Sequence, residues 1–381
     1  MIAGFNERKA IFFLVFVVPH LLVASYISAQ LERDTGVVVP SPPQKMNSGN
    51  PTIEPLPIIS YDTDVGVGYG AKCFFLNQLR FSESFDCVAF NSTKGERWYR
   101  FVFSLPDFEQ RQGKTYPLAV DVIIDYDKLI KNSFFGIGNR SEYSNREYYT
   151  REPIDISLTL SKGYSATVVV QGGARYKSVR NYHFQDSSAF LLLPPENSSK
   201  VSYQSLFFDF RYDTRNSFVN PSLGAVVECN VEESVHASFT NSQFTQLSFS
   251  LQHYSMMLYP ATVLALRAMV QGVLGSNLPV QVLPSVGGNT TVRGSPQDRF
   301  LDDIAAVVNA ELRFPIYWRF GGVAGFDAGR VWHTLADADL ARWAANPVAG
   351  LRFYRDTFIV RLDVGFGRET TGVYFNFGQL F

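Results

Sequence analysis

The stretch TFIVRLDVGFG, residues 357–367, alternates apolar with polar or small side chains through most of its length. One face of an extended chain takes the apolar residues and the other takes the rest, namely Phe358, Val360, Leu362, Val364 and Phe366 against Arg361, Asp363 and Gly365. A strand of about ten residues with this period suits a transmembrane β-barrel, which is apolar toward lipid and polar toward its lumen. A soluble β-sandwich also alternates, so one such strand does not decide between them.

The same two-residue period recurs along the chain, for example in residues 151–161 and 261–275. Beyond residue 55 no window resembles a transmembrane helix. The pattern predicts about sixteen strands, starting near residues 56–61 and 65–75 and ending with residues 372–381. The predicted fold class is all-β, a transmembrane antiparallel β-barrel of about 16 strands, closed because lipid does not tolerate an open sheet edge.

Connection lengths support this topology. An even strand count places both chain ends in the periplasm, and long connections then belong to the extracellular side. The long connections do fall on one side, at residues 128–149, 182–200, 232–241, 276–301 and 333–346. On the sixteen-strand count, residues 276–301 form the sixth extracellular loop. We expect this loop to fold back into the lumen.

Composition excludes several function classes. The chain has 381 residues, of which only 18% are charged and 15% aromatic, which is rich in rings for a soluble enzyme. A net charge of −1 provides no field that would attract nucleic acid, so no nucleic-acid partner is predicted. Cys73, Cys87 and Cys229 are odd in number and widely spaced, which indicates neither a disulfide framework nor a metal site. With no GxSxG or HExxH motif, we predict no enzyme, no cofactor and no metal.

The amino terminus resembles an export signal. Arg8 and Lys9 are followed by an apolar stretch at residues 10–27 and by small residues around Ala29. This pattern predicts a signal peptide at residues 1–29, although a permanent membrane anchor is the alternative. Residues 30–55 are predicted to be a flexible periplasmic tail, and residues 56–381 the outer-membrane β-barrel of a Gram-negative bacterium.

The sixth loop carries the segment TVRGSPQDRF, residues 291–300. Alternation in the following strands points Glu311 and Asp327 into the lumen, where the guanidinium of Arg293 could satisfy one or both through paired hydrogen bonds. Gly294 would allow the backbone to approach closely. The alternative is that Glu311, Arg313 and Asp327 pair among themselves across neighbouring strands of a watery lumen.

The last strand, GVYFNFGQLF at residues 372–381, ends on an aromatic ring. Its period places Val373, Phe375, Phe377 and Phe381 on one face. A terminal strand with Phe377 and Phe381 resembles the signal by which outer-membrane barrels are handed to their assembly machinery. The alternative is an aromatic residue at the membrane interface, which also belongs to a barrel.

These motifs together resemble the BamA/TamA-type superfamily, also called the bacterial surface antigen family. The resemblance rests on VRGSPQDRF with its Arg299 and Phe300, NAELRF at 309–314 and GFDAG at 325–329. FFGIGN at 134–139 and DTRNSFVNPSLG at 213–224 add to it. The marker of the family is Val/Leu-Arg-Gly-aromatic in the sixth loop; Val292, Arg293 and Gly294 match it, and Ser295 replaces the aromatic residue.

The resemblance implies a barrel that inserts outer-membrane proteins or secretes polypeptides. Members generally carry periplasmic POTRA domains before the barrel, whereas residues 30–55 have room for none, which resembles the barrel-only branch. The expected mechanism uses a weak seam between the first and last strands, loosened by the glycines at 66, 68, 70, 372 and 378. The expected partners are outer-membrane lipids, client polypeptides and a lipoprotein.

Three other functions remain open from the sequence. The chain could be a passive pore, or a structural barrel that anchors a lipoprotein or a surface enzyme. Barrel-embedded catalysis is a weaker fourth reading, since a barrel lipase needs no local motif. The pattern makes no prediction of oligomeric state.

Overall fold

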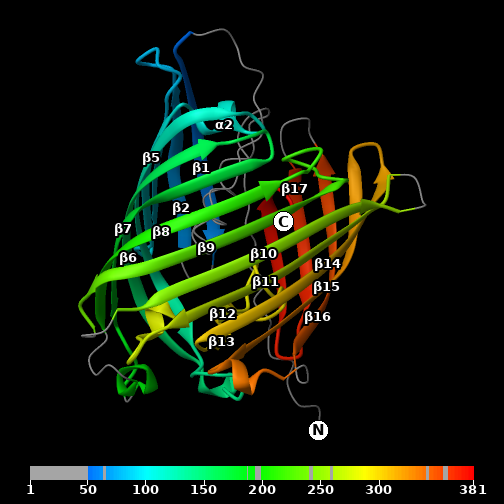
Figure 1. The fold of residues 1–381 in the computed structure, drawn as a ribbon. Helices are drawn as coiled ribbons and strands as arrows, with labels where there is room; N and C mark the ends of the chain where they lie inside the picture. The colour runs from blue at the N-terminus through cyan, green and yellow to red at the C-terminus, as the bar shows by residue number, and fades with distance from the viewer. Residues whose placement is uncertain are drawn as a thin grey trace.

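Sixteen strands form one antiparallel sheet that curls into a barrel (Figure 1). The computed structural model describes residues 50–62, 66–186, 188–193, 199–239, 243–257, 261–339, 343–354 and 359–381. Each strand of the sheet pairs with its neighbour in sequence, except that β11 pairs directly with β14. The intervening β12 and β13 form a separate two-stranded ladder. The predicted all-β class and the count of sixteen strands are confirmed.

The strands of the sheet are β1 (Thr52–Asp62), β2 (Gly66–Leu76), β3 (Ser84–Ser92), β4 (Arg97–Leu105), β5 (Tyr116–Phe134), β6 (Glu147–Gly163), β7 (Val168–Tyr182), β8 (Lys200–Asp213), β9 (Gly224–Ala237), β10 (Thr245–Met256), β11 (Val263–Leu274), β14 (Ile304–Tyr317), β15 (Phe320–Trp332), β16 (Ala344–Tyr354), β17 (Ile359–Phe366) and β18 (Thr371–Phe377). The short elements of the connections are α2 (Phe108–Arg111), η1 (Tyr143–Asn145), η2 (Ala189–Leu192), β12 (Ser285–Val286), η3 (Val280–Val282), β13 (Phe300–Leu301) and η4 (Leu335–Asp337).

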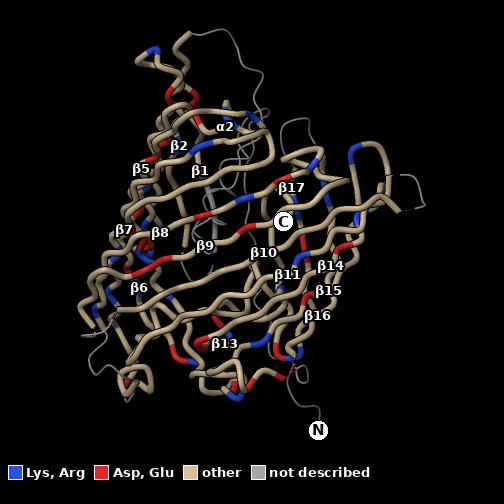
Figure 2. Tube along the Cα trace, viewed as in Figure 1, with Lys and Arg blue, Asp and Glu red and all other residues tan. Residues whose placement is uncertain are grey.

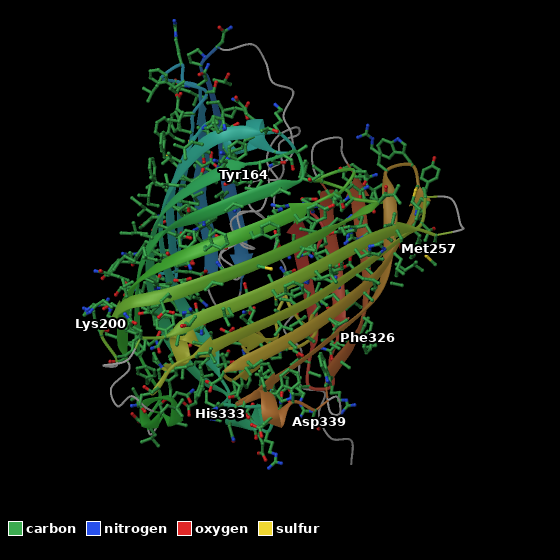
Figure 3. All side chains as sticks on the ribbon, viewed as in Figure 1. Tyr164, Lys200, Met257, Phe326, His333 and Asp339 are labelled. Atoms are coloured by element: carbon green, nitrogen blue, oxygen red, sulfur yellow. The ribbon has the colours of Figure 1, made fainter. Side chains whose placement is uncertain are left out.

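The two ends of the barrel differ in the length of their connections. We call the end that carries the connections β5–β6, β7–β8, β11–β14 and β15–β16 the long-loop rim, and the other end the short-turn rim. In Figure 3, His333 and Asp339 lie at the long-loop rim, and Tyr164 and Met257 lie at the short-turn rim. No helix among the described residues is both long and apolar enough to span a membrane.

The barrel is apolar outside and charged inside. Phe326 on β15 points outward in Figure 3 and is 47% exposed, whereas its neighbour Asp327 is fully buried. On β6 the predicted outward residues Ile154, Ile156, Leu158 and Leu160 are likewise exposed. Lysines, arginines and acidic residues lie within the strands as well as at the rims (Figure 2). This inside-out distribution fits a barrel whose outer solvent is lipid.

Several boundaries differ from the prediction. β9 continues to Ala237 and β10 begins at Thr245, so the connection expected at 232–241 begins and ends later, and the last strand ends at Phe377 instead of residue 381. β5 and β6 continue to Phe134 and from Glu147, so the connection expected at 128–149 is shorter, because a bulge between Leu129 and Asn132 lets the ladder continue. β1 begins at Thr52, and the boundary predicted at residue 56 is therefore four residues late. The predicted signal peptide and most of the predicted tail lie outside the described residues.

The sheet has two edges, β1 and β18. Among the described residues no backbone pairing joins β1 to β18, whereas every other pair of neighbouring strands is laddered. The expectation that the sheet closes is therefore wrong: the strands curl into a barrel, but within the described part of the chain the ladder between the first and last strand is not formed. β18 pairs with β17 over only seven residues, from Thr371 to Phe377. We call the gap between β1 and β18 the seam.

The end of the chain turns into the lumen, which corrects the expected place of Phe381. After β18, Gly378 has a φ of +78°, a conformation that favours glycine. Phe381 is buried beside Tyr254 and Ala265, and the guanidinium carbons of Arg267 and Arg313 lie 5.3 and 5.2 Å from its ring centroid. The expectation that Phe381 shares the outward face with Val373 is therefore wrong; the side chain of Phe377 is outside what the structure describes.

A laddered barrel of this kind should remain folded in sodium dodecyl sulfate until it is boiled, because continuous backbone ladders join its strands from β1 to β18. We expect the purified membrane protein to migrate differently on a gel before and after boiling. A single mobility at all temperatures, with recovery in the soluble cytoplasmic fraction, would contradict the membrane-barrel fold.

Candidate functional site

The connection between β11 and β14 enters the barrel lumen. We call residues 275–303 loop 6. Val286 and Val292 of this loop are fully buried and pack with Met269 on β11, with Ala305 and Val307 on β14 and with Val331 on β15. An apolar patch on the inner wall therefore seats the loop beside the charged residues of the same strands.

Arg293 is the most enclosed charge of loop 6. Its Nε and Nη2 donate to the two carboxylate oxygens of Asp327 over 2.7 and 2.9 Å. Its Nη1 donates to Glu311 over 2.7 Å and to Asp363 over 2.8 Å. All four side chains are 0% exposed. One guanidinium thus connects β14, β15 and β17 through three carboxylates.

The structure brings Arg293 to both of its expected partners, Glu311 and Asp327, and adds Asp363. Alternation in residues 357–367 places Asp363 on the lumen face, but nothing in that pattern predicts which loop residue it meets. Asp363 also accepts from Nη1 of Arg352 on β16. Of the alternative pairing among Glu311, Arg313 and Asp327 across neighbouring strands, the structure shows, among the residues it describes, only a contact within β14, where Arg313 Nη2 lies 2.8 Å from Glu311.

Hydrogen bonds join the backbone of loop 6 to the barrel wall, in addition to those of the Arg293 side chain. Asn309 on β14 donates to Asp327 over 2.8 Å and to the carbonyl of Thr291 over 2.7 Å. Arg267 on β11 donates to Asn309 and to the carbonyl of Thr290. The amide of Arg293 itself donates to Asp327 over 3.0 Å. Side chains of the inner wall therefore bind the backbone of loop 6 as well as the charge of Arg293.

Gly294 packs against the hairpin of β17 and β18. Its φ is +91°, and a Cβ built there would lie 2.7 Å from backbone atoms of Gly365 and Gly367. Its amide donates to Tyr374 Oη over 2.9 Å, and Thr370 Oγ1 donates to its carbonyl over 2.7 Å. A side chain is excluded at this position both by conformation and by space.

Ser295 stands where the resembled family has an aromatic residue. It is buried, and the Asn346 side chain on β16 donates to its Oγ over 3.1 Å and to the carbonyl of Arg293 over 2.8 Å. An asparagine that reaches the loop from β16 favours a small polar partner, which accounts physically for serine at this place.

Arg299 joins loop 6 to two other connections. Its Nε and Nη2 donate to both carboxylate oxygens of Glu369, each over 2.6 Å. Its Nη1 and Nη2 also donate to Ser141 over 2.8 and 2.7 Å. Its guanidinium carbon lies 4.4 Å from the ring centroid of Phe300 and 4.9 Å from that of Phe135. Arg299 therefore links the connections β5–β6, β11–β14 and β17–β18.

The segment FFGIGN, residues 134–139, docks on loop 6 and on β15. Gly138 donates its amide to the carbonyl of Leu301 over 2.7 Å. The Asn139 side chain bonds both the amide and the carbonyl of Val331. Phe134 packs with Tyr149, Phe190, Val280 and Leu301. The sequence resemblance marks this segment without indicating these contacts.

The segment DTRNSFVNPSLG forms the turn between β8 and β9. Asp213 accepts from the amide of Arg215 over 3.0 Å and from its Nη2 over 2.8 Å. At the tip, Asn220 Oδ1 accepts from Gln379 over 3.1 Å. This turn thus meets the inward-turned end of the chain at the short-turn rim.

Within the described residues, one group of side chains has donor atoms close enough together for a metal ion. Donor atoms of Asp302, Asp303 and His333 lie within 4.8 Å of one another at the long-loop rim (Figure 3). Burial raises the pKa of both carboxyl groups above their ordinary values. His333 Nδ1 lies 2.8 Å from a carboxylate oxygen of Asp303, so the two side chains contact each other directly, and we assign no metal to the group.

Comparisons with known proteins give a consistent result. The model of the Omp85 superfamily domain matches residues 62–381. The fold resembles BamA from Haemophilus ducreyi lacking POTRA domains 1–3, with a TM-score of 0.60 and 14% identity over 86% of this chain and 69% of that one. It also resembles CdiB from Acinetobacter baumannii (0.53; 16%; 85% and 58%) and CdiB from Escherichia coli (0.61; 15%; 91% and 68%). No curated protein sequence matches the chain.

Removing the Arg293 side chain should release loop 6 from the wall. In Arg293→Ala three buried carboxylates lose a partner, and breaking a buried ion pair costs about 3–5 kcal/mol. We expect a lower unfolding temperature and new protease cleavage within residues 285–300. Arg293→Lys should recover only part of the loss, because an amine does not reproduce the paired hydrogen bonds. The exchange Arg293→Asp with Asp327→Arg should recover more than either single change.

The matched control is Arg180→Ala. Arg180 forms an ion pair with Glu152 but is 59% exposed, and water screens an exposed pair so that it adds little to stability. If Arg293→Ala and Arg180→Ala give the same unfolding temperature and the same protease pattern, loop 6 is not tethered by Arg293.

Arg299 should govern the order of the long-loop rim. In Arg299→Ala we expect faster amide hydrogen exchange in residues 135–146 and 367–370, because both segments lose their hydrogen bonds to the guanidinium. Glu369→Gln should loosen residues 367–370 while leaving residues 135–146 protected. Equal protection of both segments in all three proteins would show that Arg299 does not join the connections.

Proposed function

The chain belongs to the Omp85 superfamily, and we propose that its barrel inserts or translocates polypeptides in the outer membrane of a Gram-negative bacterium, through the seam between β1 and β18. β-Barrels of this family are outer-membrane proteins, and its members are insertases and translocases rather than enzymes. The fold resemblance to BamA and CdiB supports the same class of activity.

The observation that carries the proposal is the pair of unjoined edges. Among the described residues each edge strand is laddered on one side only, and an unladdered strand edge is costly in lipid. A strand from a client polypeptide would satisfy them by adding to the sheet, as strands do in β-augmentation. The edges thus act as a template for the client strand.

The two sides of the seam are held differently. β18 is bonded to loop 6 through Tyr374, and the preceding turn through Thr370. β1 is held by β2, where its ladder faces the glycines at 66, 68 and 70. Glycine weakens a strand interior, so these three glycines loosen the β1–β2 ladder. The glycines at 372 and 378 lie on the other side of the seam, where Gly372 pairs with Gly365.

The interior disfavours the passive-pore alternative. Loop 6 occupies the lumen, and the charges that it meets, on Glu311, Asp327 and Asp363, are excluded from water. In a water-filled channel such charges would be solvated. No contact of the described residues specifically favours a structural barrel that anchors a lipoprotein, although a lipoprotein partner and client polypeptides both remain part of the proposal.

A crosslink across the seam should block activity. We would introduce cysteines at Pro57 or Ile58 of β1 and at Val373 of β18, with Cys73, Cys87 and Cys229 replaced by serine, and join them with a short bismaleimide. We expect the crosslinked protein in liposomes to lose its ability to assist assembly of an unfolded outer-membrane barrel, while ion conductance is unchanged.

The matched control joins Leu362 to Phe375, which face each other across β17 and β18. That crosslink adds a bond within an existing ladder and leaves the seam free, so activity should persist. If the seam crosslink leaves assembly at the level of this control, the seam is not the working element.

A further inference from the structure

The register of the sheet brings two of the three cysteines together. Cys73 on β2 lies directly opposite Cys87 on β3. Both are free thiols and half-buried in the structure. Their neighbours in alternation, Ala71 on β2 and Ala89 on β3, are exposed on the outer face of the barrel, so the two thiols share that face. Sequence spacing alone treats them as unrelated residues of the wall.

The backbone hydrogen bonds show which kind of pair this is. Thr93 donates to the carbonyl of Val67 over 2.9 Å, and Asn77 donates to that of Glu83 over 2.8 Å. Both bonds continue the register of Cys73 and Cys87, and Cys73 is an even number of residues from Val67 and from Asn77. The cysteines therefore occupy a hydrogen-bonded pair, in which the Cα atoms lie about 5.5 Å apart, within the range that disulfides span. Cβ atoms in such a pair lie about 5.5 Å apart and a disulfide needs about 3.5–4.5 Å, so the bond requires the two strands to move together locally.

We propose that Cys73 and Cys87 are a disulfide site, oxidised in the cell envelope during export. The oxidant is the disulfide of a thiol–disulfide oxidoreductase. One cysteine thiolate attacks it to form a mixed disulfide, and the second thiolate displaces the oxidoreductase to close the Cys73–Cys87 bond. The two thiol protons and two electrons pass in total to the oxidoreductase, which leaves as its dithiol. The inference rests on the envelope location given under the proposed function.

The position of the pair sets when the bond forms. The thiols face the side of the barrel that lipid covers, and a thiolate, the reactive form, is strongly disfavoured in hydrocarbon. Oxidation therefore precedes insertion, and the membrane then protects the bond from exchange. Cys73 also lies opposite Pro55 of β1, so the bond would fix the β2–β3 hairpin next to the edge strand β1.

Cys229 provides an internal reference. It lies on β9, opposite Phe210 on β8 and Phe249 on β10, with no cysteine beside it. The three cysteines of the chain are therefore one pair and one single thiol.

The test counts free thiols in protein taken from cells. Cells are quenched in acid, the envelope is dissolved in denaturant, and thiols are labelled with a maleimide polymer that shifts the gel band. The natural chain should take one label, and three after reduction. Cys87→Ser should take two labels without reduction, and Cys229→Ser none.

Three labels on unreduced protein from the envelope fraction would overturn the disulfide while leaving the proposed location intact. No label on unreduced Cys87→Ser would show that Cys73 pairs with Cys229, which also overturns it. Three labels on protein found only in the cytoplasmic fraction would overturn the location, and the disulfide with it.

Discussion

A guanidinium buried in a barrel lumen constrains everything around it. Arg293 is removed from water, and the cost of desolvating its charge is offset only if anionic partners surround it. Three strands supply carboxylates for this purpose, at Glu311, Asp327 and Asp363. These strands lie in one part of the wall, from β14 to β17. Arg293 therefore reaches all three carboxylates only if loop 6 follows this path, packs on its apolar contacts and meets strands in this register. Loop 6 is therefore an internal part of the barrel rather than a connection added to it.

The two-residue period predicted the barrel because it is a local property of each strand. Lipid outside and charge inside require every strand to alternate, so residues such as Ile154 and Arg361 reveal their faces without knowledge of their neighbours. The strand count and the sides of the long connections follow from the same signal. β5 extends beyond its predicted end, because a bulge interrupts the two-residue period near Leu129 while the ladder continues.

Contacts between segments that are far apart in the sequence are harder to predict from it. Asp363 is recognisable as a lumen residue, but its bond to Arg293 depends on how far loop 6 reaches. Phe381 continues the apolar period of β18 and nevertheless turns inward, because Gly378 breaks the strand and two arginines offer their guanidinium faces to the ring. The facing of Cys73 and Cys87 depends on the register of one hairpin, which spacing along the chain does not reveal.

The inward course of loop 6 also decides what the protein shows to its surroundings. In the proposed orientation the longest connection contributes little to the cell surface, since Val292, Arg293 and Arg299 are enclosed. Antibodies or bacteriophages would instead meet exposed residues of shorter connections, such as Leu192 and Leu335, which are 82% and 77% accessible. The enclosed part of loop 6, which holds Arg293, is thus out of reach of large molecules at the cell surface.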